Sequence, residues 1–306
     1  MTAVLTAFAV VGVTILVGYV IGRARVLGPH ARHVLSRLSF YVLSPFLLFV
    51  VLSEADIAVL FSNLLPISML AAFAIIVPFW LVSRLLWKRS LGDTVIGALS
   101  AGQVNSNNIG IPFSVYLLGS AAFPAPVIFF QLLLLTPISM ALLEAASSGS
   151  RSIKRIALQT IGNPVIIGSV LGVGCSLLGW RLPEFLAEPT HLIAGAAIPV
   201  LLLNYGISLH GQRVLTTKGL RRDVLLATGL KLIAMPLVAW LLGAFVFRIE
   251  GLELAAVVIL AALPTAQNVF NHAQRFDFGE IVARDVIFLT TLGCVPVLLL
   301  VSVLLL

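Results

Sequence analysis

Charged side chains are scarce in this sequence. Only 10% of its 306 residues are Asp, Glu, Lys or Arg, whereas 60% are hydrophobic, and the mean hydropathy is +1.12. These values lie outside the range of ordinary soluble domains and indicate an integral membrane protein. Because a helix needs roughly 20 apolar residues to cross a bilayer, the chain has room for about ten crossings and for no large soluble domain.

The sequence also lacks the motifs of several protein classes. Its two cysteines, Cys175 and Cys294, lie in apolar runs, where small buried thiols are expected. The five histidines are scattered without the spacing of metal ligands, so neither a metal nor a cofactor is expected. Paired aspartates, a Ser/His arrangement and a zinc motif are all missing from the apolar runs, which argues against an intramembrane enzyme.

Basic residues are unevenly placed along the chain. The net charge of +7 could suggest a nucleic-acid partner, but 16 of the 19 Lys and Arg residues fall in the loops after alternate apolar runs, the first, third, fifth, seventh and ninth. Such residues collect on the cytoplasmic side of a membrane. We therefore expect no nucleic acid as partner, a lipid bilayer around the chain, and both termini on the non-cytoplasmic side of a bacterial inner membrane.

Apolar runs predict ten transmembrane helices in an all-α polytopic protein. They are expected near residues 3–22, 34–52, 63–86, 93–118, 124–146, 156–179, 190–210, 223–247, 252–272 and 281–305. Residues 1–146 and 156–306 then form two five-helix repeats joined by a cytoplasmic linker, 147–155. In the second repeat, Pro199 and Pro236 correspond to Pro45 and Pro78. Since five is odd, the second repeat is inverted, as in secondary transporters.

Two apolar runs, the fourth helix of each repeat, are interrupted by amides. The first break, 102–112, contains Asn105, Asn107 and Asn108, and the second, 263–271, contains Thr265, Gln267 and Asn268. Polar groups are costly in hydrocarbon unless they face protein or a wet cavity. Proline removes a backbone donor, so Pro112 and Pro264 are expected to open crossed helices, with Gly110 permitting the turn.

Helix ends at such a crossing offer free N–H groups and a partial positive charge, which favour an anion. Two amide-rich breaks at corresponding places therefore predict a binding site for a small organic anion. The alternative is that these amides only hold helices together through interhelical hydrogen bonds.

The residues at the breaks resemble those of the auxin efflux carrier superfamily, which includes plant PIN-type exporters and bacterial carriers of malonate, malate and related acids. The resemblance rests on Asn107-Asn108-Ile109-Gly110-Ile111-Pro112 and on Ala262-Leu263-Pro264-Thr265-Ala266 with Asn268, and it extends over essentially the whole chain. Gln131, thirteen residues before Glu144, and Ser53 after Pro45 match further family positions. The resemblance implies that Asn108, Gln131 and Ser53 contact the substrate.

The resemblance also implies an architecture like that of sodium/proton antiporters and bile-acid symporters. Helices 1, 2, 6 and 7 would form a scaffold that builds a homodimer, and helices 3–5 and 8–10 would carry the substrate by an elevator-like movement. Residues 65–81 contain no ionisable side chain, whereas plant members have an acidic and a basic residue in this helix. Their coupling scheme is therefore not expected here, and transport of auxin itself is doubtful.

Two charges inside expected helices are candidates for coupling. Lys231 lies within the eighth helix, where it could replace a coupling cation, attract the substrate or serve as a structural charge. Glu144 lies near the end of the fifth helix, and a solvated position is favoured over a role in proton coupling. Asp277, Glu280, Arg284 and Asp285 are expected to pair at the surface rather than to form a gate.

The sequence thus favours a secondary transporter or uniporter of mono- or dicarboxylates such as malonate or malate, with auxin-like acids as a further class. A sodium-coupled bile-acid-type symporter or a sodium/proton antiporter is an alternative, although no acidic ion ligand lies at either break. A non-transporting membrane sensor, which would use the same pocket, is another.

Overall fold

The computed structural model describes residues 2–28, 30–54, 62–148, 162–210 and 214–306. Most of the expected linker 147–155 lies outside these residues. Within them the protein is helical, without strands, and the only β-type contact is an isolated antiparallel bridge between Val104 and Thr265. The predicted all-α class is confirmed for this part of the chain.

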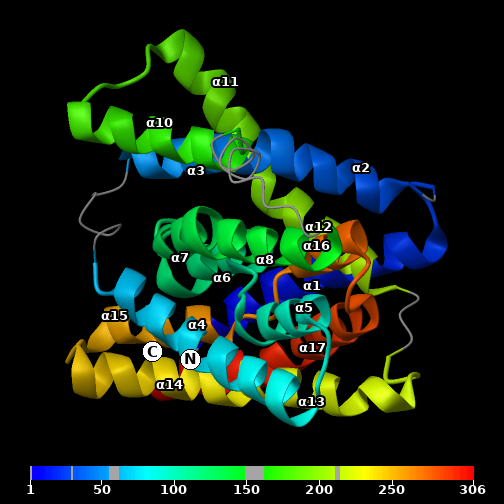
Figure 1. Ribbon diagram of the computed structural model, residues 1–306. Coiled ribbons are helices and arrows are strands. Elements are labelled where there is room, and N and C mark those ends of the chain that lie inside the picture. The colour runs from blue at the N-terminus through cyan, green and yellow to red at the C-terminus, as the bar shows by residue number, and fades with distance from the viewer. Residues whose placement is uncertain (1, 29, 55–61, 149–161, 211–213) are drawn as a thin grey trace. The chain divides into compact units, whose positions relative to one another are not determined.

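The helices follow the expected apolar runs (Figure 1). Their bounds are α1 (Thr2–Ala24), α2 (Ala31–Leu38), α3 (Ser44–Glu54), α4 (Leu64–Leu81), α5 (Leu91–Gly102), α6 (Ile111–Phe113), α7 (Ala125–Phe130), α8 (Thr136–Ser148), α10 (Pro164–Leu178), α11 (Glu184–Gly195), α12 (Ala197–Leu209), α13 (Arg221–Gly229), α14 (Met235–Leu241), α15 (Gly251–Ala262), α16 (Gln267–Phe276) and α17 (Glu280–Leu305).

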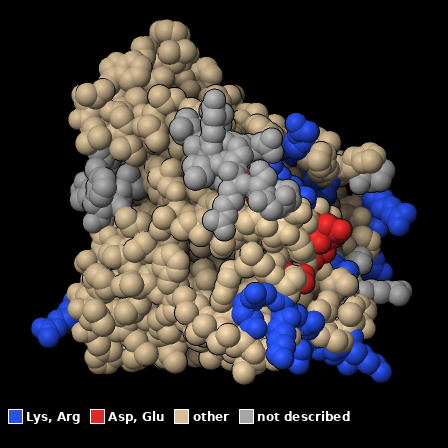
Figure 2. All heavy atoms as spheres, in the orientation of Figure 1, with Lys and Arg blue, Asp and Glu red and all other residues tan. Residues whose placement is uncertain are grey.

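Six continuous helices of the described chain are long and apolar enough to cross a membrane. They are Ala31–Glu54, Leu64–Leu86, Ala125–Ser147, Glu184–Leu209, Lys218–Val246 and Glu280–Leu305. Shorter apolar helices cover Ala9–Ala24, Pro164–Leu178 and Gly251–Ala262. The helix expected at 190–210 begins six residues earlier, at Glu184. Figure 2 shows that most of one face carries no charge, with Lys and Arg confined to a few places.

Proline widens several helices without ending them. A π-type turn lies directly before the residue that precedes each of Pro45, Pro112, Pro137 and Pro236. Proline has no N–H, so the carbonyl one turn earlier loses its partner and the helix opens locally. Such wide turns are frequent at functional sites. Asn107, Asn108, Gln131 and Lys231 all lie in these wide turns.

The chain divides into two compact units. Unit 1 comprises residues 1–62, 107–126 and 158–211, and unit 2 comprises residues 63–106, 127–157 and 212–306. Unit 1 contains α1, α2, α3, α6, α10, α11 and α12, whereas unit 2 contains α4, α5, α8, α13, α14, α15, α16 and α17. Each unit therefore combines segments from both halves of the sequence.

Unit 1 is built from two helix pairs, α1 with α12 and α3 with α10. Glycines let the backbones touch at these contacts: a Cβ on Gly18 would overlap the backbone of Leu203, and a Cβ on Gly206 would overlap that of Ile15. In the second pair, a Cβ on Gly168 would overlap the Pro45 carbonyl. Close approach through small residues is the usual way in which helices associate in lipid.

Unit 2 surrounds two short central helices, α5 and α15. Almost every residue of α5 from Gly92 and of α15 from Ala255 is buried. α5 packs on α4, α8, α13 and α17, and α15 packs on α4, α14 and α17. Both central helices have 12 residues and end inside the unit. Their carbonyl ends therefore need partners from elsewhere in the protein.

Substitution of Gly168 by alanine should destabilise the protein. The new methyl group would overlap the Pro45 carbonyl, and overpacking of this kind typically costs about 1–3 kcal/mol. Gly174→Ala in the same helix is the matched control, because a Cβ there meets nothing within 4 Å, and the gain in helix propensity is about 0.5–1 kcal/mol. Thermal unfolding in detergent measures both, and equal unfolding temperatures would contradict the packing described.

Candidate functional site

The two helix breaks pair with each other inside unit 2. α5 ends at Gly102 and α15 ends at Ala262, and each is followed by a short non-helical segment. Asn105 N–H donates to the Pro264 carbonyl at 2.8 Å, and Ala266 N–H donates to the Gln103 carbonyl at 3.0 Å. These two bonds frame the Val104–Thr265 bridge. Backbone that cannot be solvated in a membrane is thereby satisfied by its counterpart from the other half.

Thr265 anchors the crossing of the two breaks. It is fully buried, and its hydroxyl donates to the Ser100 carbonyl, at the end of α5, at 2.6 Å. Its own N–H donates to the hydroxyl of Thr290 on α17 at 3.1 Å. The Thr265 side chain therefore satisfies one of the free carbonyls at the α5 C-terminus.

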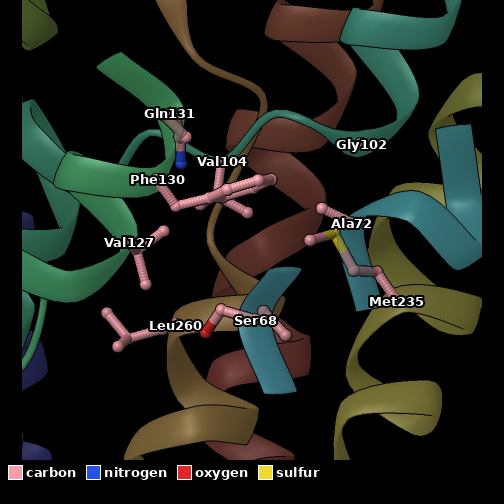
Figure 3. A pocket seen from close by; sticks show the side chains of 10 residues that line it. Ser68, Ala72, Gly102, Val104, Val127, Phe130, Gln131, Met235 and Leu260 are labelled. Atoms are coloured by element: carbon pink, nitrogen blue, oxygen red, sulfur yellow. The ribbon is translucent and has the colours of Figure 1, made fainter. Parts of the chain in front are cut away.

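A small hollow lies beside the crossing (Figure 3). Its polar side chains are Ser68 and Gln131, and its volume is about 10 Å³, about enough for one water. The remaining lining residues are Ala72, Gly102, Val104, Val127, Phe130, Met235, Leu260 and Ala261. Gln131 is 5% exposed, and its amide donates to the Ser106 hydroxyl at 3.4 Å. An organic acid would fit only if these side chains moved apart.

The expected residues of the first break are divided between the units. Asn105 is buried in unit 2, together with Gln131. Asn107 and Asn108 are half-buried in unit 1, where the Asn107 amide donates to the Ser44 hydroxyl at 3.1 Å. Ser53, also in unit 1, donates to the Val50 carbonyl of its own helix at 2.9 Å.

The opening of the first helix is not where proline predicts it. The chain leaves the helix at Gln103–Asn105, whereas Gly110 has helical angles, with φ −63° and ψ −43°, and Pro112 lies within α6. Pro112 follows the wide turn Ser106–Gly110, and the helix continues through it to Leu118. The helix therefore widens at Gly110 and Pro112 but does not break there as expected, whereas Pro264 lies at a true break.

The amides after the second break lie at the start of α16 rather than in the core. Gln267 is half-buried, and Asn268 is exposed. They follow Ala266, the residue that precedes the first turn of α16. The second break therefore contributes the buried hydroxyl of Thr265 to the crossing, while its amides lie outside.

Both candidate coupling residues are buried. Lys231 has no exposed surface, and its ammonium donates to the Ala261 carbonyl at 2.8 Å and contacts the Met235 sulfur at 3.1 Å. Glu144 is 8% exposed, so the solvated position expected for it is wrong. Asp285 is also buried, at 1% exposed, where it pairs with Arg284 and accepts the Leu215 N–H.

A larger cavity of about 390 Å³ lies at a charged end of unit 2. Arg89 and Asp223 form a bidentate pair in its wall, at 3.1 and 2.7 Å, and donation to the Asp223 carboxylate raises the pKa of the Arg89 guanidinium. Asp93, Asp277 and Glu280 also line this cavity. Asp277 and Glu280, two of the charged residues expected to pair at the surface, therefore border a polar cavity.

Several residues of the site gave no signal in the sequence. Ser68, Val127, Phe130 and Leu260 line the hollow but are ordinary members of apolar helices. The Thr290 hydroxyl accepts the backbone N–H of Thr265 at the crossing, and threonines in a membrane helix are unremarkable in a sequence. The wide turns before prolines could have been found, because each places a polar residue a few positions before a helix-internal proline.

Thr265→Val should destabilise the crossing while preserving side-chain shape. The Ser100 carbonyl would lose its donor in a buried position, at a cost of about 1–3 kcal/mol. Thr190→Val is the control, because its hydroxyl makes a 2.7 Å bond within its own helix at an exposed position. Thermal unfolding in detergent should separate the two variants; a Thr265→Val protein as stable as the control would exclude an anchoring role.

Comparison with known proteins bears on the whole chain. The family described as "Membrane transport protein" matches residues 3–302. A Rhizobium meliloti protein named "Putative malonate transporter" is 24% identical over 217 residues, which cover 69% of this chain and 67% of that protein. A Haloarcula japonica protein named "Bisanhydrobacterioruberin hydratase" is 26% identical over 131 residues, covering 40% of this chain and 44% of that protein.

The match to the second relative spans less than half of either protein, whereas the family match includes all the helices that build both units and the crossing. The family match indicates that the protein is a membrane-embedded carrier of a small molecule and not an enzyme. The chain belongs to the membrane transport protein family, that is, to the auxin efflux carrier family.

Proposed function

We propose that this transporter moves small organic anions, such as malonate or malate, by alternating access. The observation that carries the proposal is the pairing of two broken helices at Val104 and Thr265, beside the buried amide of Gln131. Crossed breaks of this kind bind substrates in secondary transporters. The similarity to a relative with malonate in its name supports the substrate class.

The pocket that we propose is rich in donors and neutral in formal charge. Asn105 and Gln131 lie near the crossing, and Asn107, Asn108 and Ser53 are further candidates for substrate contact. Amide groups donate to carboxylates, and hydrogen bonds to charged groups contribute about 1.5–3 kcal/mol each. Gln267 and Asn268 belong to the same proposal, as groups that reach the substrate from α16.

An inverted repeat underlies the proposed mechanism. Support comes from matching turns before the two central helices: Lys88 and Arg248 both have φ of 52°, and Trp87 and Phe247 both donate to a carbonyl five residues earlier. In addition, α1 and α3 of the first half of the sequence pack on α12 and α10 of the second half. Both features are expected when two copies of one five-helix motif interlock, which would give ten crossings.

The division into units supports an elevator-like mechanism. Unit 1 contains α1, α2, α3, α10, α11 and α12, which correspond to the scaffold of the resembled family, and unit 2 contains most of the transport helices. The segment 107–118 departs from this scheme, since it belongs to unit 1. Dimerisation through the scaffold, an inner-membrane location and termini on the non-cytoplasmic side complete the proposal.

Uptake of labelled malonate, malate and lactate into proteoliposomes tests the substrate class. Gln131→Ala and Asn108→Ala should each lower the initial rate by roughly 10-fold or more, because one hydrogen bond to a charged substrate is lost. Gln274→Ala, an exposed amide on α16, is the control and should leave the rate unchanged. Undiminished transport by Asn108→Ala or Gln131→Ala would remove that residue from the site, and the absence of uptake of any acid would refute the proposed function.

A second comparison asks whether both breaks serve one substrate. If they do, Asn268→Ala should impair uptake about as severely as Asn108→Ala. Substrate-induced thermal stabilisation of the purified variants gives an independent measure of binding, since a ligand that binds the folded state raises its stability. An Asn268→Ala variant with normal binding would mean that the exposed amide acts outside the site.

A further inference from the structure

The carbonyl end of α15 is closed by a positive charge. The last four carbonyls of a helix have no partner within it and carry a partial negative charge. One of these in α15 is the Ala261 carbonyl, which accepts the Lys231 ammonium at 2.8 Å. At the corresponding end of α5, the Ser100 carbonyl accepts the neutral hydroxyl of Thr265 instead. The two central helices are therefore capped by different chemistry.

The position of Lys231 makes it a fixed part of the core. It lies in the wide turn Leu230–Ala234, which packs against α4, α5, α15 and α17 within unit 2. Its side chain is among the largest that are fully buried. Among the described ion pairs none includes Lys231, so the carbonyl end of α15 is its evident electrostatic partner.

This charge lies directly behind the hollow at the crossing. Ala261 and Met235, the two residues that Lys231 contacts, both line the hollow, and Figure 3 shows the Met235 side chain there. In transporters with broken helices, the carbonyl end of a half-helix is where a coupling sodium ion is bound. A lysine ammonium offers the same charge to the same oxygen atoms, but it cannot leave.

We propose that the Lys231 ammonium is a built-in cation that occupies the carbonyl end of α15 in place of a sodium ion. A cation bonded to the chain cannot move down a gradient, so this site provides no sodium coupling. The consequence for transport rests on the function proposed above, whereas occupation of the helix end does not. Sodium should therefore neither stabilise the protein nor accelerate its transport.

Removal of the Lys231 side chain should leave a cation site at the carbonyl end of α15. The purified full-length protein, Lys231→Ala and the control Lys218→Ala, an exposed lysine of the same helical stretch, are unfolded by heat in sodium, choline and n-propylammonium chloride at equal ionic strength. We expect sodium and choline to give the same unfolding temperature for the wild type and the control. Lys231→Ala should unfold at a lower temperature in choline and gain several degrees in propylammonium, which replaces the lost side chain, and in sodium.

Two results of the thermal measurement would overturn the inference. One is a wild-type protein that sodium stabilises relative to choline. The other is a Lys231→Ala protein that unfolds cooperatively but responds to sodium and propylammonium no more than Lys218→Ala does. Both results are unfolding temperatures and need no transport assay. If the protein carried none of the acids tested, the proposed function would be refuted, but the unfolding temperatures would still test the built-in cation.

Lys231→Met keeps the inference testable if Lys231→Ala does not fold. Methionine retains most of the side-chain volume without the charge, and burying it is favourable. We expect this variant to fold and to lose most of its malonate uptake, whereas wild-type uptake stays the same when sodium is exchanged for choline. Wild-type uptake that rises with sodium, or Lys231→Met uptake equal to that of the wild type, would contradict the built-in cation.

Discussion

Hydrogen bonding of the backbone inside an apolar medium is the constraint on which the rest of this structure depends. A helix that ends within the membrane leaves free carbonyls and N–H groups, and each unsatisfied group there costs several kcal/mol. The protein meets this constraint by bringing its two interrupted helices together, so that Asn105 bonds to Pro264 and Ala266 bonds to Gln103. The two breaks stay together because each one donates a backbone N–H to a free carbonyl of the other.

The same constraint explains how much of the fold could be predicted. Apolar runs follow from the thickness of the bilayer, so helices occur where hydropathy places them. The role of each proline could not be predicted, because it depends on where the freed carbonyl finds a partner. Pro112 is accommodated by a wide turn and its helix continues, whereas Pro264 lies where the helix ends and its carbonyl accepts the Asn105 N–H.

Part of the candidate site could also be predicted from the sequence. Asn105 was singled out because amides are costly in hydrocarbon, and Gln131 because it matches a position of the resembled family; both lie in the core near the crossing. Asn268 carries the same amide but is exposed on α16, since a polar residue next to a break can lie on either side of the helix end. Ser68, Phe130 and Leu260 form the hollow through their positions alone, which residue type does not reveal.

The glycine contacts of unit 1 have a consequence for how the chain is made. Each close pair joins an early helix to a late one, since α1 packs on α12 and α3 packs on α10. At about 5–20 residues per second, synthesis from the end of α1 at Ala24 to the start of α12 at Ala197 takes roughly 9–35 seconds. During that interval Gly18 of α1 has no α12 backbone to pack against. Each helix pair of unit 1 can therefore form only after its later helix has been synthesised.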